Sequence, residues 1–118
     1  MNTYELDQRD SADPRIVLAD LGGELDLTNA RELDERLREL VPARVSTLVL
    51  DLNRVEFIDS AALHVLFRTA RRLGRERFGI ALEPTAPVAR TLALVKVADV
   101  ATVRGSIEEL LPALSAPD

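Results

Sequence analysis

Hydrophobic positions recur along the chain with two alternating periods. Short aliphatic and β-branched runs, typical of strands, occupy residues 15–21, 47–52, 78–82 and 100–103. Segments with apolar residues at helical spacing follow each run, at residues 28–41, 60–73, 88–95 and 106–114. The run at 47–52 is nearly continuous in apolar residues, as expected of a strand that is covered on both faces. We therefore predict that this strand lies at the centre of a sheet.

Turn and capping residues mark the expected ends of these elements. They are Gly22-Gly23 as a turn after the first strand, Thr28 and Pro42 at the two ends of the first helix, Gly74 after the second helix and Ser106 before the last. Residues 1–14 are more polar, and we expect only a short edge strand at Thr3–Leu6 followed by a turn. Residues 115–118 are expected to form a frayed tail.

Strands that alternate with helices of this length predict βαβ units, in which right-handed crossovers join parallel strands. The fold class is therefore α/β, with a mixed, mostly parallel sheet of four to five strands and about four packed helices. No linker, internal repeat or low-complexity tract divides the sequence. We expect one domain over residues 1–118, with its core at residues 15–114.

Composition narrows the classes of function. The 118 residues include 15 Lys and Arg against 20 Asp and Glu, and this net charge of -5 argues against nucleic acid as a partner, since nucleic-acid binding needs a basic surface. The absence of cysteine and the single histidine lead us to expect no metal ion and no cofactor. No apolar run approaches the ~18 residues of a membrane-spanning helix, and residues 1–14 do not resemble a signal peptide. We expect a cytoplasmic protein without membrane insertion.

In an open α/β sheet, ligands and partners meet the loops at the carboxyl ends of the strands. These loops are expected at residues 22–29, 53–61 and 83–87. In the second of them Phe57 and Ile58 form apolar anchors, and Asp59 and Ser60 stand where a helix begins. An acid and a hydroxyl at this place fit two compatible roles. One is a helix cap, which contributes about 1 kcal/mol, and the other is an exposed serine that serves as a modification or contact point.

Three ordered segments resemble a known family. They are Gly23-Glu24-Leu25-Asp26 followed by Thr28-Asn29-Ala30, the stretch D-L-N-R-V-E-F-I-D-S-A-A-L at residues 51–63, and Pro87-Val88-Ala89-Arg90-Thr91-Leu92. In this order and spacing they are similar to bacterial anti-sigma-factor antagonists, whose domain is shared with sulfate transporters and abbreviated STAS. The resemblance implies a STAS-like mixed sheet with packed helices. It also implies partner switching, in which the protein binds an anti-sigma factor that is itself a serine kinase and so frees the sigma factor.

The resemblance also implies roles for individual residues. Ser60 matches the serine that is phosphorylated in the family. Its phosphorylation releases the partner, and a serine phosphatase removes the phosphate again. Asp26 matches an acidic position beside the partner surface. The expected partner-binding residues are Glu24, Asp26, Thr28, Asn29, Phe57, Ile58, Asp59, Ala61, Ala62 and His64. Ala61 and Ala62 replace a small hydroxyl residue and a glycine of many members, which bears on the rate of phosphorylation more than on the fold.

Other functions stay open on the sequence. Within the same fold, the chain would be a lone STAS-domain subunit of a transporter or of another signalling complex without a sigma-factor role. A nucleotide-binding regulator is the alternative from a different class, although no motif names a nucleotide. A catalytic triad would have to combine Ser60, His64 and Asp59. No G-x-S-x-G turn precedes Ser60, adjacent Asp59 and Ser60 point in different directions, and His64 has no acid to orient it. We therefore expect no enzymatic activity.

A basic stripe follows helical spacing in the second helix: Arg68, Arg71, Arg72 and Arg75. Cations near the carboxyl end of a helix are favoured by its dipole, so a solvated face is the expected role. Docking to an acidic partner or to a membrane is the alternative.

Overall fold

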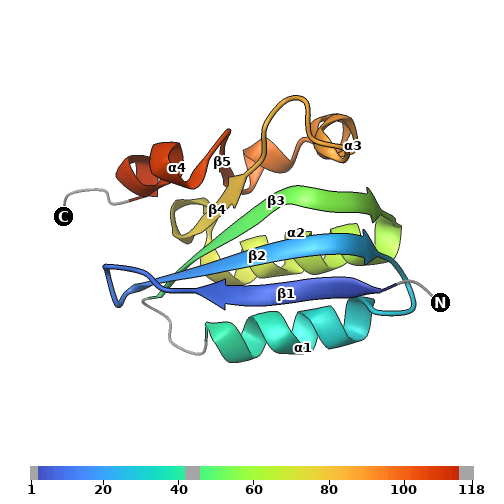
Figure 1. The fold of residues 1–118 in the computed structure, drawn as a ribbon, viewed down its shortest axis with the longest axis horizontal. Helices are drawn as coiled ribbons and strands as arrows, with labels where there is room; N and C mark the ends of the chain where they lie inside the picture. Colours follow the sequence, from blue (N-terminus) through green and yellow to red (C-terminus); the bar gives the residue numbers. More distant parts are fainter. Residues whose placement is uncertain (1–2, 42–45, 115–118) are drawn as a thin grey trace.

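The computed structural model describes residues 3–41 and 46–114. Along them the chain forms β1 (Tyr4–Arg9), β2 (Ile16–Leu25), α1 (Ala30–Leu40), β3 (Thr47–Ile58), α2 (Ser60–Leu73), the 3-10 helix η1 (Arg75–Arg77), β4 (Phe78–Ala81), α3 (Ala89–Leu94), the 3-10 helix η2 (Val97–Asp99), β5 (Thr102–Arg104) and α4 (Ile107–Leu114) (Figure 1). Pro42, expected to end the first helix, and the tail 115–118 lie outside the described residues.

The strands form one five-stranded sheet in the order β1-β2-β3-β4-β5. β1 runs antiparallel to β2, and all other neighbours are parallel. The predicted mixed, mostly parallel sheet is confirmed, and the described residues contain the four expected helices. β3 is the middle strand, as the continuous apolar run predicted, and its residues Leu48, Val49 and Leu50 are fully buried.

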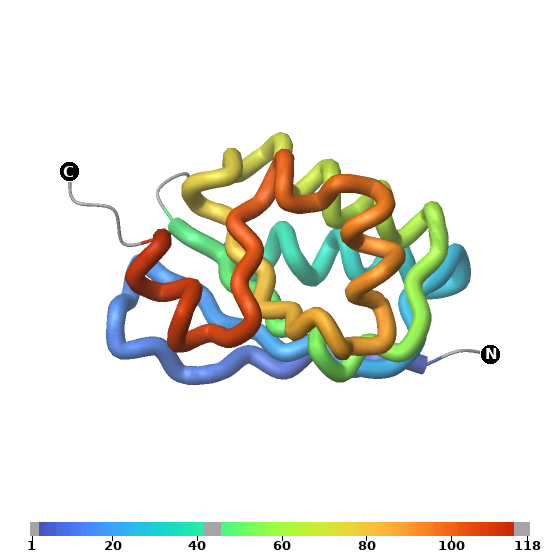
Figure 2. The backbone as a smooth tube through the Cα atoms, turned by 90° about the horizontal axis from the view of Figure 1, so that it is seen from above, coloured from blue at the N-terminus to red at the C-terminus, as the bar shows by residue number. Residues whose placement is uncertain are grey.

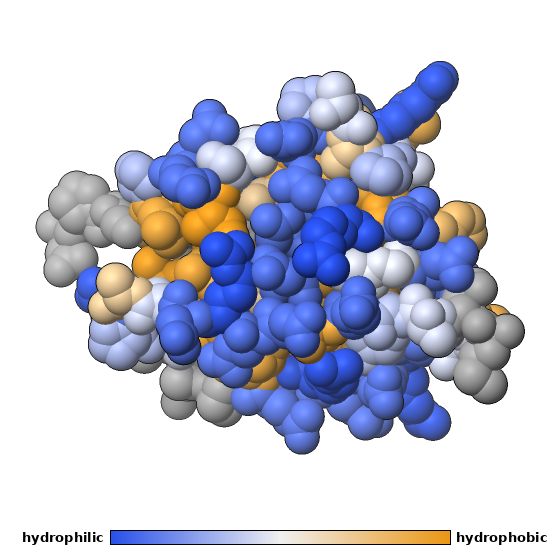
Figure 3. Space-filling model, in the orientation of Figure 1, coloured by the Kyte–Doolittle hydropathy of each residue, from blue (hydrophilic) through white to orange (hydrophobic). Residues whose placement is uncertain are grey.

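Helices cover the two faces of the sheet unequally. α1 and α2 pack on the face to which Leu48 and Leu50 point, and together they enclose the main core. α4 packs on the opposite face, where Leu110 joins Val49 and Ala81 in a smaller cluster. Figure 1 and Figure 2 both show α4 (red) beside β4 and β5 and apart from α1 (cyan). Figure 3 shows the face of the molecule formed by β1, β2 and β3 as mostly hydrophilic.

Side chains of α1 fasten the edge strand β1 to the core. The Tyr4 hydroxyl donates to the Glu32 carboxylate at 2.6 Å, and the Arg36 guanidinium donates to the Leu6 carbonyl at 3.0 Å. Burial, and then the hydrogen bond to Glu32, raise the pKa of Tyr4 above its ordinary value. β1 is longer than the predicted stretch because its pairing with β2 continues to Arg9.

The Gly22-Gly23 pair does not form the predicted turn. β2 continues through the pair to Leu25, and its pairing with β3 shifts register around it. Gly23 has a φ of +87°, and a Cβ atom there would stand 2.5 Å from the backbone oxygen of Thr3. At both register shifts the extra residue lies in β3, and Gly23 is the place where β1 passes close to β2. Glycine favours turns and also marks places where another backbone approaches a strand closely, so the sequence does not separate the two.

β3 is also longer than predicted. Residues 53–58, expected as a loop, form the second half of the strand and pair with the end of β2. Val55 and Ile58 are buried, so burial in the core overrides the polar residues that favoured a loop. Only Asp59 separates β3 from α2, which begins at Ser60 as predicted.

The other helices begin and end close to the predicted residues. α2 ends at Gly74, which has a φ of +86°. The Ser106 hydroxyl accepts the Glu109 N–H at 3.2 Å and caps α4, as predicted. The first helix is the exception, because it begins at Ala30 and the Thr28 hydroxyl bonds the Asp26 carboxylate instead of capping it.

The basic stripe is exposed at Arg68, Arg71 and Arg75, as expected of a solvated face, and three of its four side chains also bond within the domain. Arg68 pairs with Asp34 of α1 at 3.5 Å, the Arg72 guanidinium donates to the Val41 carbonyl at 3.2 Å, and Arg75 donates to the Ala98 carbonyl at 3.1 Å. Burial is the main cause that lowers the pKa of Arg72 below its ordinary value. These contacts fasten α2 to its neighbours.

Gly23→Ala should destabilise the domain more than its matched control, Gly74→Ala. The two glycines have φ angles of +87° and +86°, so both substitutions introduce strain, roughly 1–3 kcal/mol. No atom lies within 4 Å of a Cβ added at Gly74, whereas at Gly23 the Thr3 backbone must move and weaken its bond to Glu24. Urea unfolding should show a loss about 1 kcal/mol larger for Gly23→Ala. Equal losses would mean that the close passage of β1 is not a constraint.

Candidate functional site at the start of helix α2

Two segments meet at the carboxyl ends of β2 and β3. The β2–α1 loop, residues 26–29, follows Leu25, and Asp59 follows Ile58, the register partner of Leu25. The Asp59 N–H donates to the Leu25 carbonyl at 3.1 Å, which adds one bond beyond the paired residues. The loop and the start of α2 therefore lie side by side.

The Asp59 carboxylate bridges these two segments. Its Oδ1 accepts the backbone N–H of Ala62 at 3.1 Å and caps α2. Its Oδ2 accepts the backbone N–H of Leu27 at 3.0 Å. A carboxylate suits the position because it accepts on both oxygens and places negative charge at the positive end of the helix dipole. We call this pair of hydrogen bonds the Asp59 clasp.

Hydrogen bonds within the β2–α1 loop fix its shape. Asn29 accepts the Asp26 N–H on Oδ1 at 3.0 Å and donates from Nδ2 to the Glu24 carbonyl at 2.9 Å. The Asp26 carboxylate accepts the Thr28 N–H at 2.9 Å. Asp26 and Asn29, which were expected to contact a partner, are buried and hold the turn. Both side chains support the loop, and their contact with a partner stays a prediction.

Ser60 is the first residue of α2 and is exposed. Its hydroxyl has no hydrogen-bond partner within residues 3–41 and 46–114. Asp59, and not Ser60, supplies the helix cap, so the cap does not occupy the Ser60 hydroxyl. The Ser60 hydroxyl is therefore free to meet another molecule.

The other residues that were expected to bind a partner differ in their exposure to solvent. Phe57 is 48% exposed, and four others reach the surface: Glu24, Thr28, Ala61 and His64. Ile58 and Ala62 are buried in the core, so they support the site from below and do not line it.

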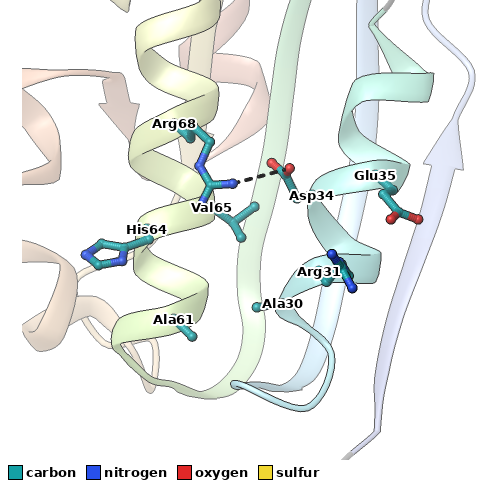
Figure 4. Close-up of a pocket in the computed structure, with 8 residues that line it drawn as sticks. All are labelled: Ala30, Arg31, Asp34, Glu35, Ala61, His64, Val65 and Arg68. Carbon is teal, nitrogen blue, oxygen red and sulfur yellow. Dashed lines mark ion pairs between the residues drawn. The ribbon is translucent and has the colours of Figure 1, made fainter.

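A groove of about 440 Å³ runs between α1 and α2 and begins at Ala61, next to Ser60 (Figure 4). It is lined by Ala30, Arg31, Asp34, Glu35, Ala61, His64, Val65 and Arg68. The ion pair between Arg68 and Asp34 crosses from one helix to the other, and His64 points away from α1. Among the described residues no hydrogen bond joins His64 to Asp59 or to Ser60, and the Asp59 carboxylate accepts backbone N–H groups instead.

Metal clusters and membrane-spanning helices are both absent from the part of the chain that the structure describes. No group of three or more His, Asp or Glu side chains there is placed to hold a metal ion. No helix there combines the length and the apolar character needed to cross a membrane.

Known protein families provide an independent comparison. The STAS domain family matches residues 8–110, most of the chain. This chain belongs to the STAS domain family. RsfB, an anti-sigma-F factor antagonist of Mycobacterium tuberculosis, is 36% identical to it over 66 residues, which make up 55% of this chain and 54% of RsfB. The match thus spans about half the length of this relative.

Solved structures share the whole fold of this STAS domain. An anti-sigma factor antagonist from Mycobacterium paratuberculosis matches it with a TM-score of 0.82 and 24% identity, over 97% of this chain and 96% of the other. Unphosphorylated SpoIIAA of Bacillus, also an anti-sigma factor antagonist, matches with a TM-score of 0.67 and 16% identity, over 98% and 100% of the two chains. The STAS-like fold inferred from the sequence resemblance is confirmed.

One exposed residue of this STAS domain was missed in the sequence. Leu27 is 78% exposed in the β2–α1 loop, between Asp26 and Thr28. Its signal in the sequence is a lone leucine among residues that favour turns. Periodicity does not detect it, because the residue belongs to neither a strand nor a helix.

Asp59→Ala should destabilise the STAS domain more than Ser106→Ala. Each substitution removes a helix cap worth about 1 kcal/mol, but Asp59→Ala also leaves the Leu27 N–H without its acceptor. Chemical unfolding should therefore show a loss of about 2 kcal/mol for Asp59→Ala against about 1 kcal/mol for the control. A loss no larger than that of Ser106→Ala would show that the bond to Leu27 adds nothing to stability.

Proposed function

We propose that this STAS domain is an anti-sigma-factor antagonist that binds an anti-sigma factor through the edge formed by the β2–α1 loop and the start of α2. Membership of the STAS family and the likeness to RsfB, which is named an anti-sigma-F factor antagonist, support the proposal. Binding would occupy the anti-sigma factor and leave a sigma factor free. This role belongs in the cytoplasm, with the transcription machinery.

The exposed, unbonded hydroxyl of Ser60 beside the Asp59 clasp is the observation that carries the proposal. SpoIIAA, which shares the fold, has been solved in an unphosphorylated and a phosphorylated form. We propose that the anti-sigma factor is a serine kinase that phosphorylates Ser60. A serine phosphatase then restores the hydroxyl and the binding surface.

Electrostatics favour release of the partner over unfolding of the domain. A phosphate adds about -1.5 to -2 charge, and the dipole at a helix N-terminus favours an anion by ~0.3–1 kcal/mol, so the free domain stays folded. In a packed interface the same charge must lose its water beside the Asp59 carboxylate, where like charges cost several kcal/mol. Each 1.4 kcal/mol is about tenfold in affinity, so the interface effect dominates.

Phosphate transfer should be confined to Ser60. The wild-type chain, incubated with ATP and in turn with each anti-sigma-factor kinase of its organism, should gain one phosphate, and Ser60→Ala should gain none. Thr28→Ala is the matched control, because it removes the exposed hydroxyl of the neighbouring loop and should leave phosphorylation intact. Mass spectrometry of the intact chain and of its peptides measures both. Phosphate on another residue, or none with every kinase, would refute phosphorylation of Ser60.

The charge at residue 60 should control affinity for the anti-sigma factor. Ser60→Asp and Ser60→Asn have nearly the same shape and differ by one charge. Calorimetry should show Ser60→Asp binding about tenfold more weakly than Ser60→Asn. Equal weakening would mean that side-chain size, and not charge, disrupts the interface. If no anti-sigma factor of the organism binds the wild-type chain, the proposed function is wrong.

A further inference from the structure

We propose that Leu27 is the apolar anchor of the partner surface, and that the anti-sigma factor receives it in an apolar pocket with a basic rim. This inference rests on the proposed function, because it identifies the residues through which the partner is held. Among the described residues, the exposed large apolar side chains are Leu27, Phe57, Leu94 and Val95. The first two of these lie in the segments that meet at Ser60.

Leu27 is exposed, yet its backbone is fixed. A single exposed leucine is common on protein surfaces and needs no explanation by itself. Here the Leu27 N–H is held by Asp59, and hydrogen bonds to Asp26 and Thr28 fix the residues on either side. A loop that is already ordered loses little backbone freedom on binding. Burial of a leucine side chain then contributes roughly 10- to 100-fold in affinity.

Charge around this leucine identifies the chemistry of the partner. Residues 24–29 and 56–60 contain no basic residue, and the carboxylates of Glu24, Glu56 and Asp59 reach the surface, whereas Asp26 is buried. Glu24 is the register partner of the exposed Phe57, so acidic and apolar groups alternate at this edge. Neither Glu24 nor Glu56 forms an ion pair with a described residue. Lysine or arginine side chains around an apolar pocket would complement this surface.

Asp59 links the position of the Leu27 backbone to the phosphorylation state of Ser60. Its carboxylate is shared between the Leu27 N–H and the first turn of α2, directly next to Ser60. A phosphate on Ser60 adds a second anion at this helix end, which repels the Asp59 carboxylate and competes for the same N–H donors. Asp59 is therefore a positioning residue that presents Leu27 while the clasp is closed.

Leu27→Ala and Leu94→Ala give a matched test of the anchor. Leu27 is 78% and Leu94 72% exposed, but Leu94 lies in α3, outside the two acidic segments. The probe is the purified anti-sigma-factor kinase that binds the wild-type chain, titrated by calorimetry. Leu27→Ala should weaken binding about tenfold or more and Leu94→Ala about twofold or less, with both melting temperatures within about 2 °C of wild type. Equal affinities of the two variants would overturn the proposal.

Amide hydrogen exchange tests the clasp apart from binding. In Asp59→Asn the remaining oxygen still caps α2, but the amide nitrogen cannot accept the Leu27 N–H. The Leu27 amide should exchange about fivefold faster or more in this variant and in the Ser60-phosphorylated chain, while the Ala62 amide of Asp59→Asn stays protected. An unchanged exchange rate of the Leu27 amide would show that Asp59 does not position Leu27.

The proposed function and this inference fail in different ways. If no anti-sigma factor binds the wild-type chain, the function falls and the inference falls with it. If the wild-type chain binds, and loses its partner on phosphorylation of Ser60, while Leu27→Ala binds normally, the inference alone falls.

Discussion

The carboxylate of Asp59 accepts the N–H of Leu27, 32 residues earlier in the chain, and the N–H of Ala62 in the adjoining helix, and the geometry of the candidate site depends on it. Each of these N–H groups would otherwise need water, because the first turn of a helix and a tight loop both leave backbone donors without partners. One side chain satisfies both. The loop and the helix therefore keep a fixed relation, and Leu27 and Ser60 stay at the same edge of the domain.

The sheet places this carboxylate. β2 and β3 end together, with Leu25 opposite Ile58, and the next bond joins the Asp59 N–H to the Leu25 carbonyl. β2 keeps its pairing with both neighbours up to that end, although its register with β3 shifts twice, each time at an extra residue in β3. A slip of one residue in β2 would turn Leu25 to the other face of the sheet and move the loop away from Asp59. The pairing of β2 with β3 thus sets the register on which the site depends.

The order of elements was predictable because the apolar periods are long and the capping residues are distinct. Asp59 and Ser60 were found at the start of α2 for the same reason, since few residue types cap a helix. The sequence did not separate a strand from a turn at Gly22-Gly23, or a strand from a loop at residues 53–58, because pairing and burial in the folded domain decide both. Nor does sequence position show which loop side chains face inward. The exposure of Leu27 could be recognised only from the structure, in which nearby Asp26 and Asn29 are buried.

Phosphorylation of Ser60 is proposed to act on the interface and to leave the fold intact, and one paired measurement on the same sample tests this directly. The chain, phosphorylated on Ser60 and purified, is compared with the unmodified chain for its Kd with the anti-sigma factor and for its melting temperature. We expect Kd to rise about tenfold or more while the melting temperature changes by less than about 3 °C. A phosphorylated domain that melts far lower, or that binds as tightly as the unmodified one, would contradict the account.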